Sequence, residues 1–274
     1  MDVCNKIDTT IVAANAVAIR RRIIELAFKA GKNGAHTGGC LSLVEILSTL
    51  YFLKKDTVTI SDNRNRVILS KGHGALALYC TLERYGFLSC KQTDTFETNG
   101  THYFAHASRN INEGIEFSGG SLSLGISFAV GVALACKSKE LNNHIYVIVG
   151  DGECNEGLLW EAVMSMANYQ LDNVTVIVDC NRLQSDGFTN EVMDTGSLAS
   201  KFHAFGFATY EVDGHSIDQL TEAFAAANMG KPKAIIANTI KGKGVTFMEN
   251  QAAWHHGVVN KELFDRAITE LNKI

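Results

Sequence analysis

Five short hydrophobic segments, set between helical patterns, constrain the fold of this chain more than any other feature of its sequence. Each segment is five or six residues long and rich in apolar residues, which is typical of buried strands. The segments are residues 66–70, 145–149, 174–179, 208–212 and 234–239. The helical patterns between them are residues 75–85, 122–137, 158–169 and 217–227. Because such alternation requires right-handed crossovers, the sequence predicts a doubly wound α/β fold, a mostly parallel sheet of about five strands flanked by helices.

Helical periodicity also precedes and follows this region. Apolar residues recur at helical spacing over residues 11–30 and 41–53, and residues 261–273 are helix-like. The segment 32–39 is rich in glycine and is expected to be a loop between the first two helices. No internal repeat, proline-rich linker or low-complexity tract divides the chain, so we expect one domain over residues 1–274.

Charge and hydropathy argue against two classes of partner. The 25 Lys and Arg residues nearly balance the 29 Asp and Glu residues, and neither sign forms a long block that could follow a nucleic-acid backbone. The longest apolar run in a strand-like context, residues 145–149, is far shorter than the about 20 residues that cross a bilayer. We therefore expect no nucleic-acid partner and no membrane span.

The N-terminal residues and the cysteines indicate a compartment. Asp2, Lys6 and Asp8 precede any long apolar stretch, so the features of a secretory signal are missing. The seven cysteines form no C-x-x-C pair, and their odd number suits reduced thiols better than disulfides or a structural zinc site. The sequence thus predicts a cytoplasmic protein.

Three loops follow strands at the edge where open parallel sheets bind ligands, beyond the carboxyl ends of the strands. They are residues 71–74, 150–153 and 180–183. The loop beginning at Gly150 lacks the glycine spacing of a dinucleotide fingerprint, since Asn155 stands where a glycine is needed, and the chain contains no Walker A loop. Asp151 at one strand end and Asn181 at the next instead offer hard oxygen ligands for a divalent cation that could bridge to a diphosphate.

Several motifs together resemble those of one enzyme family. Gly150, Asp151 and Gly152, followed by Asn181, resemble the thiamin-diphosphate motif of transketolase-like enzymes. Residues 34–38 and 70–75 resemble the first and second histidine motifs of that family, residues 120–122 resemble the loop that covers the cofactor, and residues 241–257 resemble its last motif. The order of the motifs also agrees, and the resemblance covers roughly residues 10–260.

The resemblance implies the cofactors thiamin diphosphate and Mg²⁺. Asp151, Asn181 and the backbone carbonyl of Leu183 would hold the cation, which suits their hard oxygen atoms. Further residues would contact the cofactor; these are Gly152, His73, His256, Gly120, Ser121 and Leu122. Glu156 matches an acid that the family places between its two cofactors across the subunit interface, and its alternative role is a first-turn glutamate favoured by the helix dipole.

The resemblance also implies histidines that move protons when the carbon–carbon bond of a ketose is cut. These would be His36, His73, His106 and His256, and imidazole suits the task because its unperturbed pKa is about 6.5. His106 lacks the flanking glycine and proline typical of the family, so His102 is an alternative to it. His255 and His256 form a tandem of which one need face the cofactor, and we choose His256 because Gly257 follows it.

By the same resemblance, the activity is the transfer of a two-carbon ketol unit from a ketose or its phosphate to an aldose or its phosphate. The chain is similar in length to the N-terminal subunit of split transketolases. That similarity implies a partner subunit carrying the pyrimidine-binding and C-terminal domains, an assembly with two copies of each polypeptide, and little activity without the partner. Which ketose and aldose are used is left open.

Three other functions compete with this one. A split 1-deoxyxylulose-5-phosphate synthase would share the magnesium motif but decarboxylate pyruvate. A magnesium-dependent phosphohydrolase would use Asp151 as its nucleophile and need no thiamin. A non-catalytic binding subunit would keep the fold and lose the chemistry, which the histidines argue against.

Overall fold

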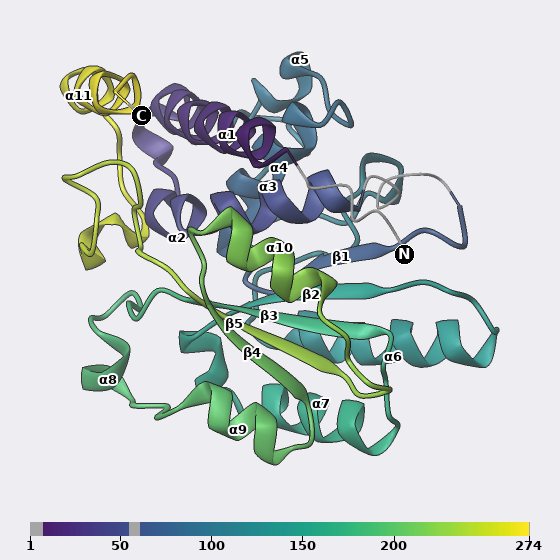
Figure 1. Ribbon diagram of the computed structural model, residues 1–274. Helices are drawn as coiled ribbons and strands as arrows, with labels where there is room; N and C mark the ends of the chain where they lie inside the picture. The colour runs from purple at the N-terminus through teal and green to yellow at the C-terminus, as the bar shows by residue number, and fades with distance from the viewer. Residues whose placement is uncertain (1–7, 55–60, 274) are drawn as a thin grey trace.

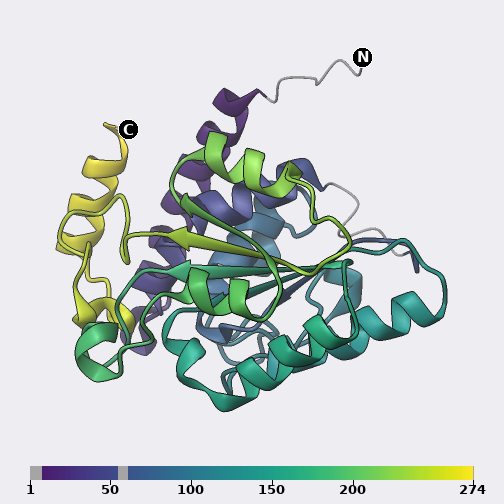
Figure 2. The ribbon, with the colours of Figure 1, turned by 60° about the horizontal axis from the view of Figure 1, so that its bottom comes forward.

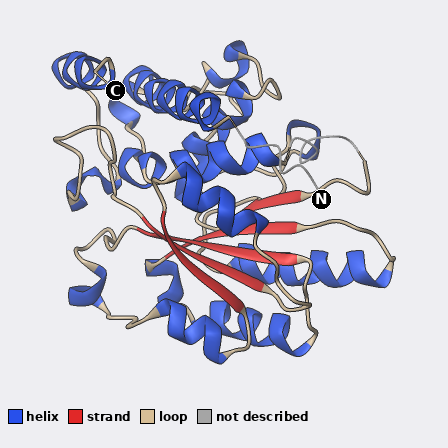
Figure 3. Cartoon of the chain, in the orientation of Figure 1, coloured by secondary structure: helices blue, strands red, loops and turns tan. Residues whose placement is uncertain are grey.

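The computed structural model describes residues 8–54 and 61–273, and its centre is a parallel five-stranded sheet. The strands are β1 Arg66–Leu69, β2 Ile145–Gly150, β3 Val174–Cys180, β4 Ala208–Asp213 and β5 Lys233–Asn238. Their order across the sheet is β1-β2-β3-β5-β4, and every neighbouring pair is parallel. Figure 3 shows the strands fanning across the middle of the molecule with helices on both sides. The predicted α/β fold and all five predicted strands are confirmed.

Helices cover both faces of the sheet (Figure 1). One face carries α1 Thr9–Lys29, α2 Thr37–Leu41, α3 Val44–Leu53, α4 Ala75–Arg84, α10 Ile217–Ala225 and α11 Lys261–Leu271. The other carries α6 Leu124–Ser138, α7 Gly157–Asn168 and α9 Leu198–Ala204. Two short helices, α5 Cys90–Thr93 and α8 Thr189–Val192, lie within connections. Figure 2 shows α6 and α7 running side by side along one edge of the molecule.

Alternation along the central strands explains why the sheet has two hydrophobic cores. Ile148, Ile177 and Ile235 pair across β2, β3 and β5 and belong to the core under α1, α3 and α4. Their neighbours Val147 and Val176 point the other way, into the core under α6, α7 and α9. Because both faces of a parallel sheet are buried, its strands read as nearly continuous apolar runs, which is why the sequence pattern was informative.

The glycine-rich segment 32–39 is not the continuous loop that the sequence predicts. Helix α2 begins at Thr37 and all five of its residues are buried. Its close packing depends on glycine, since a Cβ added to Gly38 would lie 2.7 Å from the backbone oxygen of Trp254. Tertiary packing therefore overrides the low helix propensity of glycine in this turn.

Two further expectations concern cysteines and membranes. Six cysteines are unpaired in the structure, and Cys4 lies outside the described residues. Within residues 8–54 and 61–273, no helix has both the length and the apolar character needed to cross a membrane.

Candidate functional site

A cavity of about 250 Å³ lies beyond the carboxyl ends of β1, β2 and β3. Loops that are far apart in the sequence contribute to its wall. The residues that line it are His36, Lys71, His73, His106, Gly120, Leu122, Gly150, Asp151, Gly152, Glu153, Asn181, Leu183, Gln184, Ser185 and His255. Three residues of the predicted site, Ser121, Glu156 and His256, do not line it. The strand-end rule applied to the sequence points to the edge of the sheet where this cavity lies.

Asp151 directly follows β2 and places a buried carboxylate in the wall of the cavity. Only 4% of the residue is exposed, and its oxygens accept hydrogen bonds from the backbone N–H of Gly152 at 2.8 Å and of Arg182 at 2.5 Å. Burial, together with the nearby Asp179 carboxylate, raises its pKa. In the part of the chain that the structure describes, no Lys, Arg or His forms an ion pair with Asp151. A buried carboxylate without a cationic partner is suited to bind a cation.

The other predicted cation ligands lie on the adjacent strand end. The side-chain oxygen of Asn181 accepts a hydrogen bond from the backbone N–H of Leu183 at 3.1 Å, so the turn after β3 is held locally. The carbonyl oxygen of Leu183 accepts from the Lys241 ammonium at 2.8 Å, and burial lowers the pKa of that lysine to about 8. A cation at Leu183 would therefore require Lys241 to release this carbonyl, while the donor set of carboxylate, amide and carbonyl oxygens fits Mg²⁺.

Two unpaired polar atoms in the wall also suit a bound group. Among the described residues, Nδ1 of His36 and Nε2 of Gln184 are buried without a hydrogen-bond partner. The side chain of Gln184 packs against Gly152, where an added Cβ would lie 3.0 Å from its Cγ. Buried donors and acceptors are normally satisfied, so such atoms at a cavity wall indicate places where a ligand can bond.

Histidines form a cluster around His36. Its ring centroid lies 5.9 Å from that of His73, 5.2 Å from His106, 5.6 Å from His255 and 4.7 Å from His256. The cluster draws on the turn before α2, the turn after β1, the connection between α5 and α6, and the segment before α11. No group of three or more His, Cys, Asp or Glu side chains within residues 8–54 and 61–273 is arranged to hold a metal ion, so the cluster is not a metal centre in this geometry.

Burial keeps the imidazoles of His36, His73 and His255 neutral. It lowers the pKa of His36 to about 3, with further lowering from His256, His106 and His255, and it lowers the pKa of His255 to about 4 together with Lys241. The pKa of His73 falls well below its usual range for the same reason, with Lys71 adding to the effect. A neutral imidazole can accept a proton at one ring nitrogen while the N–H of the other donates a hydrogen bond, so these three side chains can bind hydroxyl groups and accept their protons.

The structure distinguishes the histidines that the sequence left as alternatives. His106 lines the cavity, whereas His102 lines a separate hollow beside α5. Within the tandem, His255 lines the cavity and its Nδ1 lies 3.1 Å from the Lys241 ammonium. His256 instead contacts the ring of His36 from outside the cavity, so the choice of His256 as the cavity-facing member does not match this wall.

A buried ion pair to which the sequence analysis gave no role lies next to the site. Lys71 and Asp179 are fully buried and form an ion pair, and Asp179 also accepts hydrogen bonds from the hydroxyls of Ser42 and Thr239. Burial alone would raise the pKa of Asp179, but the Lys71 ammonium and these donors lower it overall. A signal was available, because each residue is a charge at the end of an otherwise apolar strand segment.

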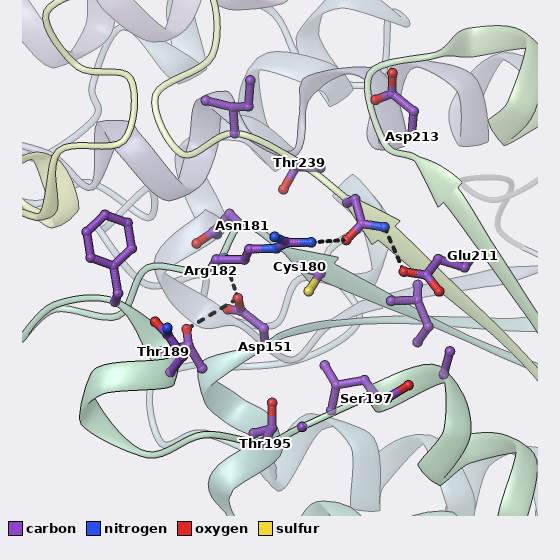
Figure 4. Close-up of a pocket in the computed structure, with 18 of the residues that line it drawn as sticks. Asp151, Cys180, Asn181, Arg182, Thr189, Thr195, Ser197, Glu211, Asp213 and Thr239 are labelled. Carbon is purple, nitrogen blue, oxygen red and sulfur yellow. Dashed lines mark hydrogen bonds between the residues drawn. The ribbon is translucent and has the colours of Figure 1, made fainter.

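A larger cavity of about 920 Å³ opens on the other side of Asp151 and Asn181, towards β4 and β5 (Figure 4). In this view Thr189 and the Arg182 backbone point toward Asp151, and Arg182 also reaches Asn238. None of the five clustered histidines lines this cavity, and neither do Gly120, Gly150 and Gly152. The larger volume therefore does not make this cavity the better candidate site, since the histidines line the smaller cavity.

The neutral histidines predict how the stability of the chain depends on pH. Unfolded histidine takes up a proton near pH 6.5, whereas folded His36 and His255 do so only near pH 3 and pH 4. Unfolding between these values is accompanied by proton uptake, so the free energy of unfolding should fall as the pH drops from about 6.5 towards 4. In urea titrations across this range, His36→Asn should make the free energy of unfolding fall less steeply with pH. The change in slope should be at most that due to the uptake of about one proton on unfolding.

The matched control for that substitution is His203→Asn, on the exposed side of α9. If the slope with His36→Asn equals that of the parent chain, His36 is not held neutral in the folded state.

Comparisons with known proteins agree with this geometry. The chain matches the family described as "Transketolase, thiamine diphosphate binding domain" over residues 13–270. It is 40% identical over 263 residues to a 6-deoxy-6-sulfo-D-fructose transketolase subunit of Clostridium sp., covering 94% of this chain and 95% of that protein. It is 38% identical over 262 residues to one subunit of the apulose-4-phosphate transketolase of Phocaeicola vulgatus, covering 93% and 91%. The solved transketolase of Campylobacter jejuni superposes with a TM-score of 0.86 at 26% identity, and the match covers 96% of this chain but 43% of that one.

Proposed function

This chain belongs to the transketolase family of enzymes, and from that premise we propose that it is the diphosphate-binding subunit of a split transketolase. The enzyme would transfer a two-carbon ketol unit from a ketose or ketose phosphate to an aldose or aldose phosphate. The observation that carries the proposal is one cavity whose lining includes Asp151 and Asn181 together with His36, His73, His106 and His255. The proposed cation ligands and proton-transfer groups would thereby lie within reach of one cofactor.

The cofactor would be thiamin diphosphate, held through Mg²⁺. Asp151, Asn181 and the Leu183 carbonyl would bind the cation, and the absence of a cationic side chain bonded to Asp151 in the described residues supports this. Lys241, on giving up the Leu183 carbonyl, would be free to contact the diphosphate, since an ammonium and a diphosphate attract strongly. Gly152 and His73 would contact the same group, and Gly120, Ser121 and Leu122 would cover it.

When bound, thiamin diphosphate supplies an electron sink for cleavage of the carbon–carbon bond of the ketose. The histidines of this chain would hold and move the protons of the sugar hydroxyls. Four histidines line the cavity and would contact the substrate directly: His36, His73, His106 and His255. His256 does not line the cavity and would act through its contact with the ring of His36. The neutral state of His36, His73 and His255 supports a role as proton acceptors, and the imidazolium formed would return the proton in the reverse direction.

The names of two relatives support a substrate class. One is described as a 6-deoxy-6-sulfo-D-fructose transketolase subunit and the other as an apulose-4-phosphate transketolase subunit. This chain is 40% identical to the first and 38% identical to the second. We propose a ketose whose far end carries an anion, a phosphate or a sulfonate. The groups that bind this anion would come mainly from the partner subunit.

The partner would supply the pyrimidine-binding and C-terminal domains, with residues 1–274 forming the single diphosphate-binding domain of a complex with two copies of each chain. The match covers 43% of a longer solved transketolase, and two relatives are described as subunits, which supports a partner chain. Glu156 is exposed at the N-terminus of α7 and does not cap that helix with its side chain. It would face the subunit interface, where it could approach a cofactor that its own cavity does not hold.

The proposal is tested by an affinity pull-down of the tagged chain from its source cells with thiamin diphosphate and Mg²⁺ present. We expect one stoichiometric partner, identified by mass spectrometry, and ketol transfer that appears only when the two chains are combined.

Other outcomes would replace the proposal. A chain that binds no thiamin diphosphate and cleaves phosphate esters would be a phosphohydrolase using Asp151. A complex that decarboxylates pyruvate would be a 1-deoxyxylulose-5-phosphate synthase, and a complex that binds the cofactor without turnover would identify a binding subunit.

A further inference from the structure

Glu153 is a buried carboxylate in the wall of the cavity to which neither the motifs nor the comparisons give a role. It follows Asp151 by two residues, and only 2% of it is exposed. Its carboxylate accepts hydrogen bonds from the backbone N–H of Ser123 at 2.6 Å, the backbone N–H of Gly150 at 3.1 Å and the hydroxyl of Ser70. With three donors, the carboxylate is well satisfied without contacting any ligand.

The three donors belong to three different loops of the site. Ser70 precedes the turn that carries His73, and Gly150 directly precedes Asp151. Ser123 directly follows the segment 120–122, which is proposed to cover the cofactor. One carboxylate therefore joins the histidine turn, the cation-binding turn and the cofactor-covering loop.

The covering loop is held in a conformation that it would not adopt readily by itself. Ser123 has φ 64° and ψ −8°, a left-handed conformation that costs energy for any residue other than glycine. The loop also presses against the turn after β1, because a Cβ added to Gly72 would lie 2.6 Å from the backbone nitrogen of Gly120. The bond from the Ser123 N–H to Glu153 is the charge-assisted contact that fixes this loop against its neighbours.

We propose that Glu153 is a positioning residue, which acts through Ser123 and Ser70 to hold the cofactor-covering loop and the histidine turn in place for thiamin diphosphate. The proposal rests on the proposed function, since it concerns the same cofactor. Glu153 contributes no bond to the cofactor, and its negative charge is spread over three donors instead of facing the diphosphate.

The test compares cofactor affinity in the enzyme assembled with its partner, or in the full chain alone if no partner is recovered. Equilibrium dialysis with labelled thiamin diphosphate and Mg²⁺ gives an affinity that does not depend on activity. Glu153→Gln removes the charge and turns an amide N–H₂ towards one of the three donors. Binding of thiamin diphosphate should weaken by about 10- to 100-fold, the range that is common when a residue that orients direct ligands is replaced. The matched control is Glu161→Gln on the exposed side of α7, which should bind like the parent.

A rescue experiment separates positioning from a general loss of stability. Glycine adopts φ 64° without cost, so Ser123→Gly added to Glu153→Gln should restore much of the lost affinity without restoring the carboxylate. Ser70→Ala, which removes one donor and keeps the carboxylate, should weaken binding by a smaller factor and gives an answer even if Glu153→Gln does not fold.

Three results decide the matter. Cofactor affinity of Glu153→Gln or Ser70→Ala equal to that of Glu161→Gln would overturn the positioning role, and so would the failure of Ser123→Gly to recover any affinity. If the parent enzyme itself binds no thiamin diphosphate, the proposed function fails instead, and the two failures are thereby distinguished.

Discussion

Replacing Asp151 with asparagine is expected to lower cofactor-dependent ketol transfer by at least about 100-fold, since a direct cation ligand should matter more than an outer group, whose loss typically costs 10- to 100-fold. The amide is nearly the same size but carries no charge for the cation. Its N–H₂ would also oppose the backbone N–H of Gly152 or Arg182, both of which donate to this side chain. Titrations of activity with Mg²⁺ and with thiamin diphosphate measure the loss, and very high concentrations of both should recover part of it.

Stability should not follow activity in this variant. Burial already raises the pKa of Asp151, so removing the charge relieves a desolvation cost that offsets the donor–donor contact of the amide, and Asp151→Asn should unfold at a temperature close to that of the parent chain. The control is Asp218→Asn, an exposed aspartate in the first turn of α10. If Asp151→Asn keeps the activity of Asp218→Asn at low Mg²⁺, the cation is not held by Asp151.

Replacing Lys71 with methionine should have the largest effect on stability, about 3–5 kcal/mol lower free energy of unfolding. The substitution leaves Asp179 fully buried with hydroxyl donors but without its ammonium partner. The loss should shrink at low pH, because without Lys71 the pKa of Asp179 rises and protonation removes the unpaired charge. Denaturant titrations at neutral and acidic pH measure both effects.

A second substitution tests the cause. Asp179→Asn added to Lys71→Met removes the stranded charge and should recover part of the stability, so the two effects should be far from additive. Lys261→Met is the comparison, since the exposed Lys261–Asp265 pair on α11 should contribute about 1 kcal/mol or less. A Lys71→Met chain as stable as Lys261→Met would show that the buried pair does not support the sheet edge.

The sheet could be predicted because the burial of each central strand is visible in a short stretch of the sequence. Strands such as β2 and β3 are buried on both faces, so each is a short apolar run, and the helices between them reveal the crossovers. Helix α2 was missed because its stability comes from contact with the segment around Trp254, which is remote in the sequence. The short helices α8 and α9 were missed too, since each has at most two turns and is too short to repeat an apolar spacing clearly.

The site could be predicted in part for the same reason. Asp151 and Asn181 follow adjacent strands, so the parallel pairing of β2 with β3 is enough to bring them together. The orientation of His255 and His256 depends instead on how the segment after β5 returns to His36, where Ala35 and Gly257 form a bridge. Partners such as Ser123 for Glu153 are set by three-dimensional packing of loops, and no sequence spacing reports them.

Calorimetric titration of thiamin diphosphate into the enzyme, once with Mg²⁺ and once with a chelator, tests the central claim most directly. The account predicts saturable binding with Mg²⁺, no measurable binding in the chelator, and loss of the Mg²⁺-dependent heat in Asp151→Asn. Binding that is equally tight without a divalent cation, or that survives unchanged in Asp151→Asn, would contradict it.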